Sequence, residues 1–382
     1  MKHKNTLIMI HPHFTIPGGA GKVVLELGKR ISKTMNVVII AQIINPEYIK
    51  NYPEIKFESL NGPITSSFKF WIFLPYWRKK TFDIVNKYRQ QGEIRLFCST
   101  FPANWIGLPY KKSYPEIKCF WFCQEPSAFI HIKKWRNAIP NRFKRIIANT
   151  LAPVLAIYDK RIAHYADKVF VNSSFSQGKT KEVYNITGVV IYPGIDVNKF
   201  RPINYKNKED YILTVARLSK FKNVDMLVRA FAKLKNKKIK LKIVGDGEEK
   251  TNLADLAQQL GVSKRVKILS GLSDKEVADS FSKAKIFVLC SKEEPFGMVP
   301  VEALASGTMA IADNSGGPKE IIDNNRNGIL IEEMNEDKLA KCVDNLLLNE
   351  DKIKLFSSKA RTRVTEVFSW EKSATKMMRY LK

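Results

Sequence analysis

Two carboxylates of this sequence are spaced so that both can reach one binding site. Glu294 and Glu302 lie on either side of Phe296 and Gly297, after the apolar run 286–290. We expect that run to be a strand, which puts Glu294 on the next loop and Glu302 in the first turns of a helix. Carboxylates accept hydrogen bonds from the vicinal hydroxyls of a sugar. A capping acid plus a surface glutamate is the alternative, but an unpaired carboxylate in so apolar a helix would be costly.

Basic side chains follow another predicted strand. Arg217 and Lys222 come directly after the apolar run 211–216, five residues apart on one loop. At this spacing they can converge on a diphosphate, the arginine through its planar guanidinium and the lysine as a point charge. A solvated basic loop is the competing interpretation in so basic a chain.

Glycine-rich turns follow two further predicted strands. Gly18 and Gly19 lie between the first strand and a helix, and Gly245 with Asp246 follows the strand 239–244. Unpaired N–H groups at a helix N-terminus attract phosphate, and glycine lets the backbone approach a ligand closely. The first turn matches neither GxGxxG nor a P-loop. For both turns, a tight turn without a ligand is the alternative.

Together these motifs resemble the retaining glycosyltransferases of family 4, which have the GT-B fold. Glu294 and Glu302 are similar to the family's E-x7-E signature, and further motifs follow in the family's order along nearly the whole chain. They are Gly18-Gly19, 192–196, Arg217 with Lys222, 244–247, 313–320 and 368–370.

The resemblance implies an α/β architecture of two doubly wound Rossmann-like domains facing a central cleft, with the C-terminal helix crossing back to the first domain. Arg217 and Lys222 would hold the diphosphate of a UDP- or GDP-sugar, Glu302 the ribose hydroxyls, and Glu294 the transferred sugar. The remaining donor-binding residues would be Gly18, Gly19, Gly245, Asp246, Phe296 and Gly297. The reaction implied is a retaining hexosyl transfer in which the donor phosphate takes the acceptor's proton. It would need no metal and no other cofactor, and the chain contains no D-x-D.

One segment departs from the family pattern. Many relatives carry a Cys-His-Glu-Pro-like sequence where this chain has Cys-Gln-Glu-Pro, with Gln124 in place of the histidine. Glutamine hydrogen-bonds but cannot shuttle a proton. One interpretation is that Gln124 only orients a substrate, with Glu125 on the acceptor side. Another is that His131 or His11 has taken over the role of the missing histidine. The third is that the enzyme is weak or inactive.

The motifs lie at the ends of strands in a regular pattern. Short apolar runs alternate with helix-period segments such as 19–32 and 223–234, which is typical of parallel sheets covered on both faces. Ligands bind at the carboxyl ends of such strands, where the motifs lie. The polar stretch 196–210 predicts a domain boundary. We expect an acceptor-binding domain of residues 1–198 with 369–382, and a donor-binding domain of residues 199–368.

The charge of the chain indicates an anionic partner. The chain has 382 residues, which is more than a single hydrophobic core usually contains, and it carries a net charge of +27. Residues 1–200 hold 30 Lys+Arg and 12 Asp+Glu, which is +18 of that total. Aromatic and basic side chains are mixed in 68–80 and 133–145, which suits the interface of an anionic membrane. The alternative is helices with solvated cations.

These observations together predict where the protein acts. We expect a peripheral protein at the cytoplasmic face of the membrane whose acceptor is a glycan or a lipid-linked glycan. Five cysteines without a CxxC pair indicate reduced thiols and no structural metal. A nucleic-acid binder is disfavoured, because the aromatics lie in apolar clusters. A sugar-nucleotide epimerase of the same fold is the enzymatic rival.

Overall fold

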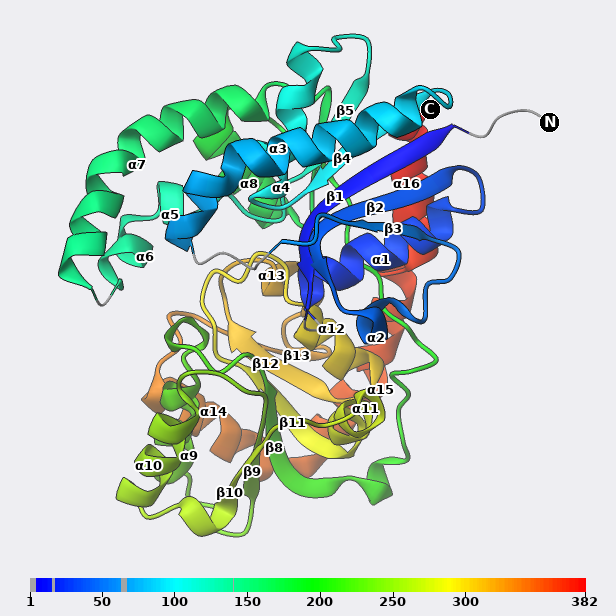
Figure 1. Ribbon diagram of the computed structural model, residues 1–382. Coiled ribbons are helices and arrows are strands. Elements are labelled where there is room, and N and C mark those ends of the chain that lie inside the picture. The colour runs from blue at the N-terminus through cyan, green and yellow to red at the C-terminus, as the bar shows by residue number, and fades with distance from the viewer. Residues whose placement is uncertain (1–4, 16–17, 63–66, 140) are drawn as a thin grey trace. The chain divides into compact units, whose positions relative to one another are not determined.

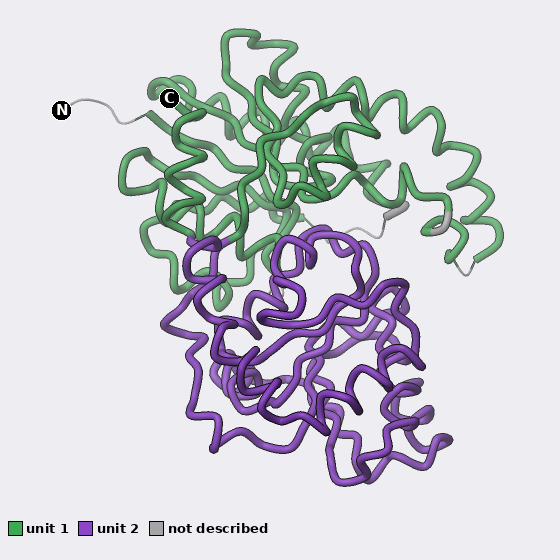
Figure 2. The backbone as a smooth tube through the Cα atoms, turned by 180° about the vertical axis from the view of Figure 1, so that it is seen from behind, with its two compact units in different colours: residues 1–193, 370–382 green, residues 194–369 purple. Residues whose placement is uncertain are grey.

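The computed structural model describes residues 5–15, 18–62, 67–139 and 141–382, apart from the side chains of 67–69 and 134. Pro17, which precedes the glycine turn at Gly18, therefore lies outside the described residues, as do the side chains of Phe68, Lys69 and Lys134 in the aromatic and basic segments. The chain divides into unit 1, Met1–Pro193 with Trp370–Lys382, and unit 2, Gly194–Ser369 (Figure 2). The predicted boundary after residue 198 falls inside unit 2.

Unit 1 is built on a seven-stranded parallel sheet with the order β3-β2-β1-β4-β5-β6-β7. Its strands are β1 (Thr6–Phe14), β2 (Asn36–Ile44), β3 (Lys56–Ser59), β4 (Ile94–Ser99), β5 (Lys118–Phe122), β6 (Lys168–Val171) and β7 (Val189–Val190). Because helices cover both faces, the central strands are continuous apolar runs, and β4 is buried along its whole length.

The helices of unit 1 pack on this sheet from opposite sides (Figure 1). They are α1 (Gly19–Ile31), α2 (Pro46–Ile49), α3 (Ser67–Arg89), α4 (Ala103–Gly107), α5 (Ala128–His131), α6 (Lys133–Asn137), α7 (Arg142–Ala163), α8 (Ser174–Tyr184) and α16 (Trp370–Leu381), with the 3₁₀ turn η1 (Leu108–Lys112). Ile8 of β1 shares a core with Trp77 of α3 and Trp105 of α4. Met9, the next residue, lies against α1 at Gly28, as the alternation of side chains along a strand requires.

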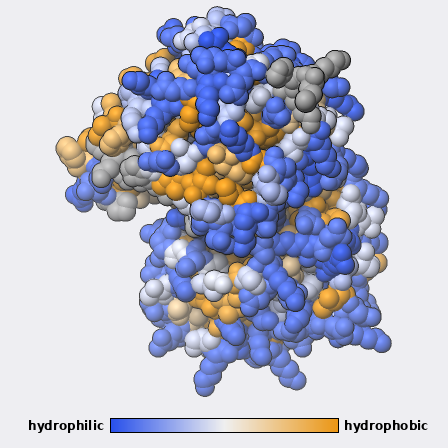
Figure 3. All heavy atoms as spheres, turned by 45° about the vertical axis from the view of Figure 1, so that its right-hand side comes forward, coloured by the Kyte–Doolittle hydropathy of each residue, from blue (hydrophilic) through white to orange (hydrophobic). Residues whose placement is uncertain are grey.

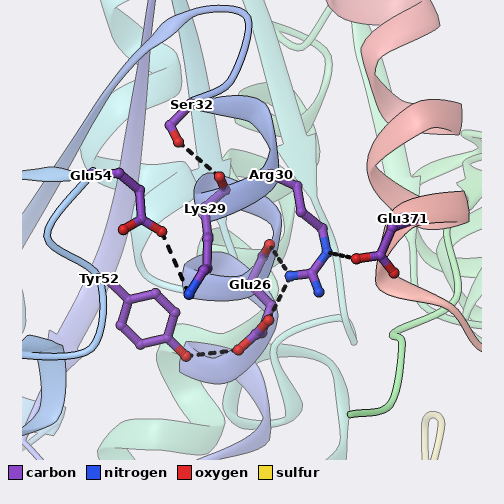
Figure 4. Close-up of polar contacts among 7 residues, drawn as sticks. All are labelled: Glu26, Lys29, Arg30, Ser32, Tyr52, Glu54 and Glu371. Atoms are coloured by element: carbon purple, nitrogen blue, oxygen red, sulfur yellow. Dashed lines mark hydrogen bonds and ion pairs between the residues drawn. The ribbon is translucent and has the colours of Figure 1, made fainter. Parts of the chain in front are cut away.

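The C-terminal helix α16 belongs to unit 1 and packs on α1. Arg30 links the two helices, since it donates to Glu26 Oε2 of α1 at 2.6 Å and to Glu371 Oε1 of α16 at 2.9 Å (Figure 4). Tyr52 donates to the other oxygen of Glu26 at 2.9 Å. Trp370 at the start of α16 is buried. This position confirms the return of the last helix to the first domain.

Unit 2 is built on a six-stranded parallel sheet with the order β10-β9-β8-β11-β12-β13. Its strands are β8 (Glu209–Val215), β9 (Lys240–Val244), β10 (Val266–Leu269), β11 (Ala284–Leu289), β12 (Met309–Asp313) and β13 (Gly328–Ile331). Its helices are α9 (Val224–Lys233), α10 (Lys250–Gln259), α11 (Asp274–Lys283), α12 (Met298–Ala305), α13 (Pro318–Ile321), α14 (Glu336–Leu347) and α15 (Glu350–Val367), with 3₁₀ turns η2 (Tyr205–Asn207), η3 (Lys220–Lys222) and η4 (Ser263–Arg265).

The two parallel sheets confirm the predicted α/β class. The sequence did not predict β3 and β13, which are four-residue strands at the edges of the two sheets. All five cysteines are free thiols, and four of them are buried. Among the described residues, no helix is long and apolar enough to cross a membrane.

Candidate functional site

The best-formed candidate site lies in unit 2 at the carboxyl ends of β8 and β11. These strands are neighbours in the sheet, and the strand order reverses between them. Adjacent loops diverge at such a point of a parallel sheet, so ligands bind there. The loop after β8 carries Arg217 and Lys222, and the loop after β11 carries Glu294.

Lys222 and Glu294 form the centre of this site. Lys222 Nζ lies 2.7 Å from Glu294 Oε2, and the two side chains are 30% and 19% exposed. Ser291 Oγ donates to the same carboxylate oxygen at 2.7 Å. The structure thus brings together two predicted site residues that are 72 positions apart in the chain.

The loop after β12 packs on the backbone of Glu293 and Glu294. Gly317 N donates to the carbonyl oxygen of Glu294 at 2.8 Å, and Ser315 Oγ accepts from Glu293 N at 2.9 Å. Gly316 has a φ of +69°, and a Cβ at this position would lie 2.5 Å from the Glu294 carbonyl oxygen. Only glycine allows this approach, which fixes the backbone that carries Glu294.

The segment after Glu294 leads into helix α12. Phe296 is buried and packs edge-to-face on Phe368 with ring centroids 5.5 Å apart, so its side chain belongs to the core of unit 2. Gly297 is the N-cap of α12 in a left-handed conformation, with a φ of +95°. Glu302 follows in the second turn of α12 and is half-buried. The N-terminus of α12 therefore lies close to the loop that carries Glu294, and Glu302 lies one turn further along the helix.

Arg217 occupies a different environment from Lys222. Its side chain is 73% exposed, and its Nη2 lies 3.6 Å from Glu248 Oε2. The neighbouring glycine loop packs directly on the Arg217 loop, because Leu218 N donates to the carbonyl oxygen of Asp246 at 2.8 Å. A Cβ on Gly245 would lie 1.8 Å from the Ala216 carbonyl oxygen. Close packing of two loops thus accounts for Gly245, while the side chain of Asp246 is exposed.

A groove of about 530 Å³ lies beside this site, between α9 and α10. Ser219, Lys220 and Asn223 line one wall, and Glu249 and Asn252 line the other. Lys222, Glu294 and Glu302 are not among its lining residues, so the groove is separate from the candidate site.

In unit 1, Gly18 and Gly19 form the start of α1. Gly18 is its N-cap, and its N–H lies 3.2 Å from the hydroxyl oxygen of Tyr48. A Cβ on Gly18 would meet nothing within 4 Å. Packing inside unit 1 therefore does not require glycine here, in contrast to Gly245.

Gln124, Glu125 and His131 follow strand β5 in unit 1. The Gln124 carbonyl accepts from Ser176 Oγ at 2.9 Å, and its side-chain Nε2 is buried without a hydrogen-bond partner among the described residues. Glu125 is exposed. His131 Nε2 donates to Asp159 Oδ2 of α7 at 2.8 Å.

Asp159 is a buried polar centre that sequence reasoning missed. Its side chain is fully buried and accepts from Tyr184 Oη at 2.7 Å, from Asn104 Nδ2 at 3.3 Å and from Trp105 Nε1. With His131, four donors converge on one carboxylate, which satisfies a charge that would otherwise be costly inside a core. The available sequence signal was its isolation, because Asp159 is the only acidic residue in 128–163.

His11 does not offer a proton-transfer group. It is buried near the end of β1, and burial, together with the neighbouring His13, lowers the pKa of its imidazole to about 3. The ring therefore stays neutral and inaccessible near neutral pH. Within the described part of the chain, no three His, Cys, Asp or Glu side chains are grouped as metal ligands.

Comparison with known proteins identifies relatives of this chain. The family described as "Glycosyl transferases group 1" matches residues 196–363. An uncharacterized glycosyltransferase of Methanocaldococcus jannaschii is 35% identical over 179 residues, which cover 47% of this chain and 46% of that protein. The alignment thus spans about half of that relative.

A further relative and a solved structure match along nearly the whole chain. N-acetylgalactosamine-N,N'-diacetylbacillosaminyl-diphospho-undecaprenol 4-alpha-N-acetylgalactosaminyltransferase of Campylobacter jejuni is 28% identical over 95% of this chain and 96% of its own length. Sucrose-phosphate synthase of Thermosynechococcus elongatus superposes with a TM-score of 0.82 at 21% identity, covering 99% of this chain and 98% of that one. This likeness confirms the predicted GT-B fold.

Proposed function

Because residues 196–363 match the family described as "Glycosyl transferases group 1", we propose that the chain transfers a sugar from a nucleoside-diphosphate donor to an acceptor hydroxyl, with retention at the anomeric carbon. The observation that carries this proposal is the Lys222–Glu294 pair at the point where the strand order of unit 2 reverses. A cation and sugar-binding carboxylates at that point suit the two ends of a sugar nucleotide.

Different side chains of unit 2 bind different parts of the donor. Lys222 and Arg217 offset the charge that develops on the leaving diphosphate. Glu294 accepts hydrogen bonds from the transferred sugar, and Glu302 from the ribose. The bond from the anomeric carbon to the diphosphate oxygen breaks and its electron pair leaves with the diphosphate. The acceptor oxygen bonds to that carbon, and its proton passes to the donor phosphate.

The acceptor in this proposal is a lipid-linked glycan bound by unit 1. The Campylobacter relative, which aligns along 95% of the chain, has a name that specifies a diphospho-undecaprenol acceptor. The charge of +18 on residues 1–200 suits a phosphate-bearing lipid in an anionic membrane. Gln124, Glu125 and His131 are the acceptor-side residues, with Gln124 orienting the substrate.

A screen of nucleotide sugars for thermal stabilisation tests the donor site. A ligand at 100 times its dissociation constant adds about 2.7 kcal/mol to stability, so the correct donor raises the unfolding temperature measurably. Transfer from that donor to membrane lipid extract is then followed by product analysis. We expect Lys222→Ala and Glu302→Ala to abolish transfer while the protein stays folded.

Lys233→Ala is the matched control. Lys233 is also an ion-paired lysine of unit 2, with Glu336 Oε1 at 2.7 Å, but it lies on α9 away from the site. It should leave transfer unchanged. Full activity of either site variant would refute the assignment of the donor site. Consumption of the donor without an acceptor, with exchange of solvent hydrogen into the sugar, would indicate an epimerase instead.

A further inference from the structure

Helix α7 of unit 1 has two apolar faces, of which unit 1 covers only one. The inner face, with Ala148, Ala152 and Ile162, is buried. Phe143 lies nine residues before Ala152, and Ile157 lies nine residues after Ala148. Nine residues make two and a half turns of helix, so Phe143 and Ile157 lie on the face opposite to these alanines. Phe143 is 73% and Ile157 72% exposed.

The exposed side forms a continuous apolar stripe, which we call the α7 face. It consists of Phe143, Ile146, Leu151, Val154 and Ile157. Trp135 of α6 and Ile132 beside it are also exposed. Eleven of the sixteen large hydrophobic side chains that are exposed in the described part of the chain lie on α3, on α7 or at 132–135. Orange atoms at the upper left of Figure 3 mark this part of unit 1.

The charges around the α7 face are almost all positive. Residues 128–163 contain eight Lys and Arg and one acid, Asp159. Asp159 is fully buried and hydrogen-bonded inside unit 1, so it does not offset the cations. Arg142 and Lys144 are exposed at the start of α7, and Lys160 and Arg161 are exposed at its end. The stripe is therefore apolar along its middle and cationic at both ends.

We propose that the α7 face docks on an anionic lipid bilayer, with α7 lying in the plane of the interface. An apolar stripe flanked by cations gains from burial among acyl chains and from attraction to anionic headgroups. A second copy of this chain fits less well, because two surfaces of like charge repel each other. This proposal rests on the proposed function and deepens it, because that function includes a lipid-linked acceptor.

The structure also changes which segment carries the membrane contact. The sequence indicated residues 68–80 and 133–145 equally. Trp77 and Leu74 of α3 are buried, however, Arg78 Nε donates to the Trp105 carbonyl at 2.8 Å, and Lys80 Nζ to the Leu60 carbonyl at 3.4 Å. Much of α3 is thus bound into unit 1, and the α7 face is the freer surface.

Co-sedimentation with vesicles tests this proposal. The full chain is mixed with vesicles of phosphatidylglycerol and phosphatidylcholine in equal parts, or of phosphatidylcholine alone, at about 0.1 M salt, where the Debye length is about 10 Å. We expect retention on the anionic vesicles only. The variant Ile146→Gln/Val154→Gln/Ile157→Gln should lower the partition coefficient at least tenfold, since each apolar side chain contributes about tenfold when buried.

Matched variants separate this surface from other effects. Leu348→Gln/Leu355→Gln removes exposed leucines of unit 2, at 85% and 49% exposure, and should leave vesicle binding unchanged. The α7 variant should keep the thermal stabilisation by nucleotide that wild type shows, which proves that it is folded. Lys222→Ala should keep vesicle binding, so a wrong donor site and a wrong docking surface give different results.

Three outcomes would overturn the proposal. The first is no retention of the wild-type chain on anionic vesicles, and the second is retention of the α7 variant equal to that of wild type. The third is a dimer in sedimentation velocity that the α7 variant converts to a monomer, which would make a second copy the occupant of this face.

Discussion

Replacing Glu294 by glutamine should tighten the binding of a bare nucleoside diphosphate while sugar transfer falls. In the structure, Lys222 already has a carboxylate partner, with 2.7 Å between Nζ and Oε2. A diphosphate that binds Lys222 must therefore compete with Glu294. Glutamine removes the competing charge and also the repulsion between a carboxylate and the diphosphate, but it accepts weaker hydrogen bonds from the sugar.

The size of this effect follows from the exposure of the pair. The two side chains are 30% and 19% exposed, so solvent screens their attraction, and the contribution of such a pair is about 0.5–1 kcal/mol. Released to the ligand, that energy corresponds to a two- to fivefold lower dissociation constant, at about 1.4 kcal/mol per factor of ten. Transfer should fall further than this, because the hydrogen bonds that we propose between Glu294 and the sugar would act during the reaction.

Titration calorimetry with UDP and with GDP measures the first effect. Glu294→Gln should bind one of them two- to fivefold more tightly than wild type, and Lys222→Met should bind it at least tenfold more weakly. Glu336→Gln is the control, because Glu336 also pairs with a lysine at 2.7 Å, Lys233 at the C-terminal end of α9. Tenfold weaker binding by Glu294→Gln would refute the reasoning, since Glu294 would then hold the nucleotide itself. Unchanged binding by Lys222→Met would remove Lys222 from the diphosphate site.

Three further predictions concern stability and can be read from urea unfolding. Folded His11 has a pKa of about 3 against an ordinary value of 6.5, so the native state binds fewer protons than the unfolded state between these pH values. The free energy of unfolding should therefore fall by up to about 5 kcal/mol as the pH falls through this range. His11→Asn should make this pH dependence weaker. Asp159→Leu should cost about 3–5 kcal/mol at pH 7, because four buried donors lose their acceptor, and equal midpoints for both proteins would contradict the network. Gly245→Ala should cost at least about 2 kcal/mol, since its Cβ would lie 1.8 Å from a carbonyl oxygen, whereas Gly18→Ala, with nothing within 4 Å, should cost under about 1 kcal/mol.

The sequence predicted the strands that carry the site because those signals are local. Apolar runs between turn residues located β8, β9, β11 and β12, and the motifs at their carboxyl ends followed from the chemistry of parallel sheets. It could not predict partners that the fold brings together. The contact of Lys222 with Glu294 depends on β8 and β11 being adjacent, which is a property of strand order and not of either segment.

The exposed face of α7 and the role of Asp159 in unit 1 could not be predicted from the sequence for a related reason. Periodicity shows that α7 is apolar on more than one side, but it does not say which side the sheet will cover. Asp159 stands out in the sequence only as the single acidic residue of 128–163, which does not show that it is buried. Its role depends on donors from α4, α5 and α8, which reach it only in the folded unit.

Helix α7 links the two ideas about unit 1. Its outer face carries Ile157 in the stripe proposed to meet the bilayer. Its inner face carries Asp159, which hydrogen-bonds His131, a residue we propose for the acceptor side. The two residues are two positions apart and therefore about 200° apart around the helix. Docking the outer face on a bilayer would fix the depth of α7, and with it the height of His131 above the lipid headgroups. An acceptor hydroxyl carried on a lipid diphosphate lies at a similarly fixed height. Under this proposal, the excess positive charge of the first half of the chain orients unit 1 on the bilayer so that these two heights match.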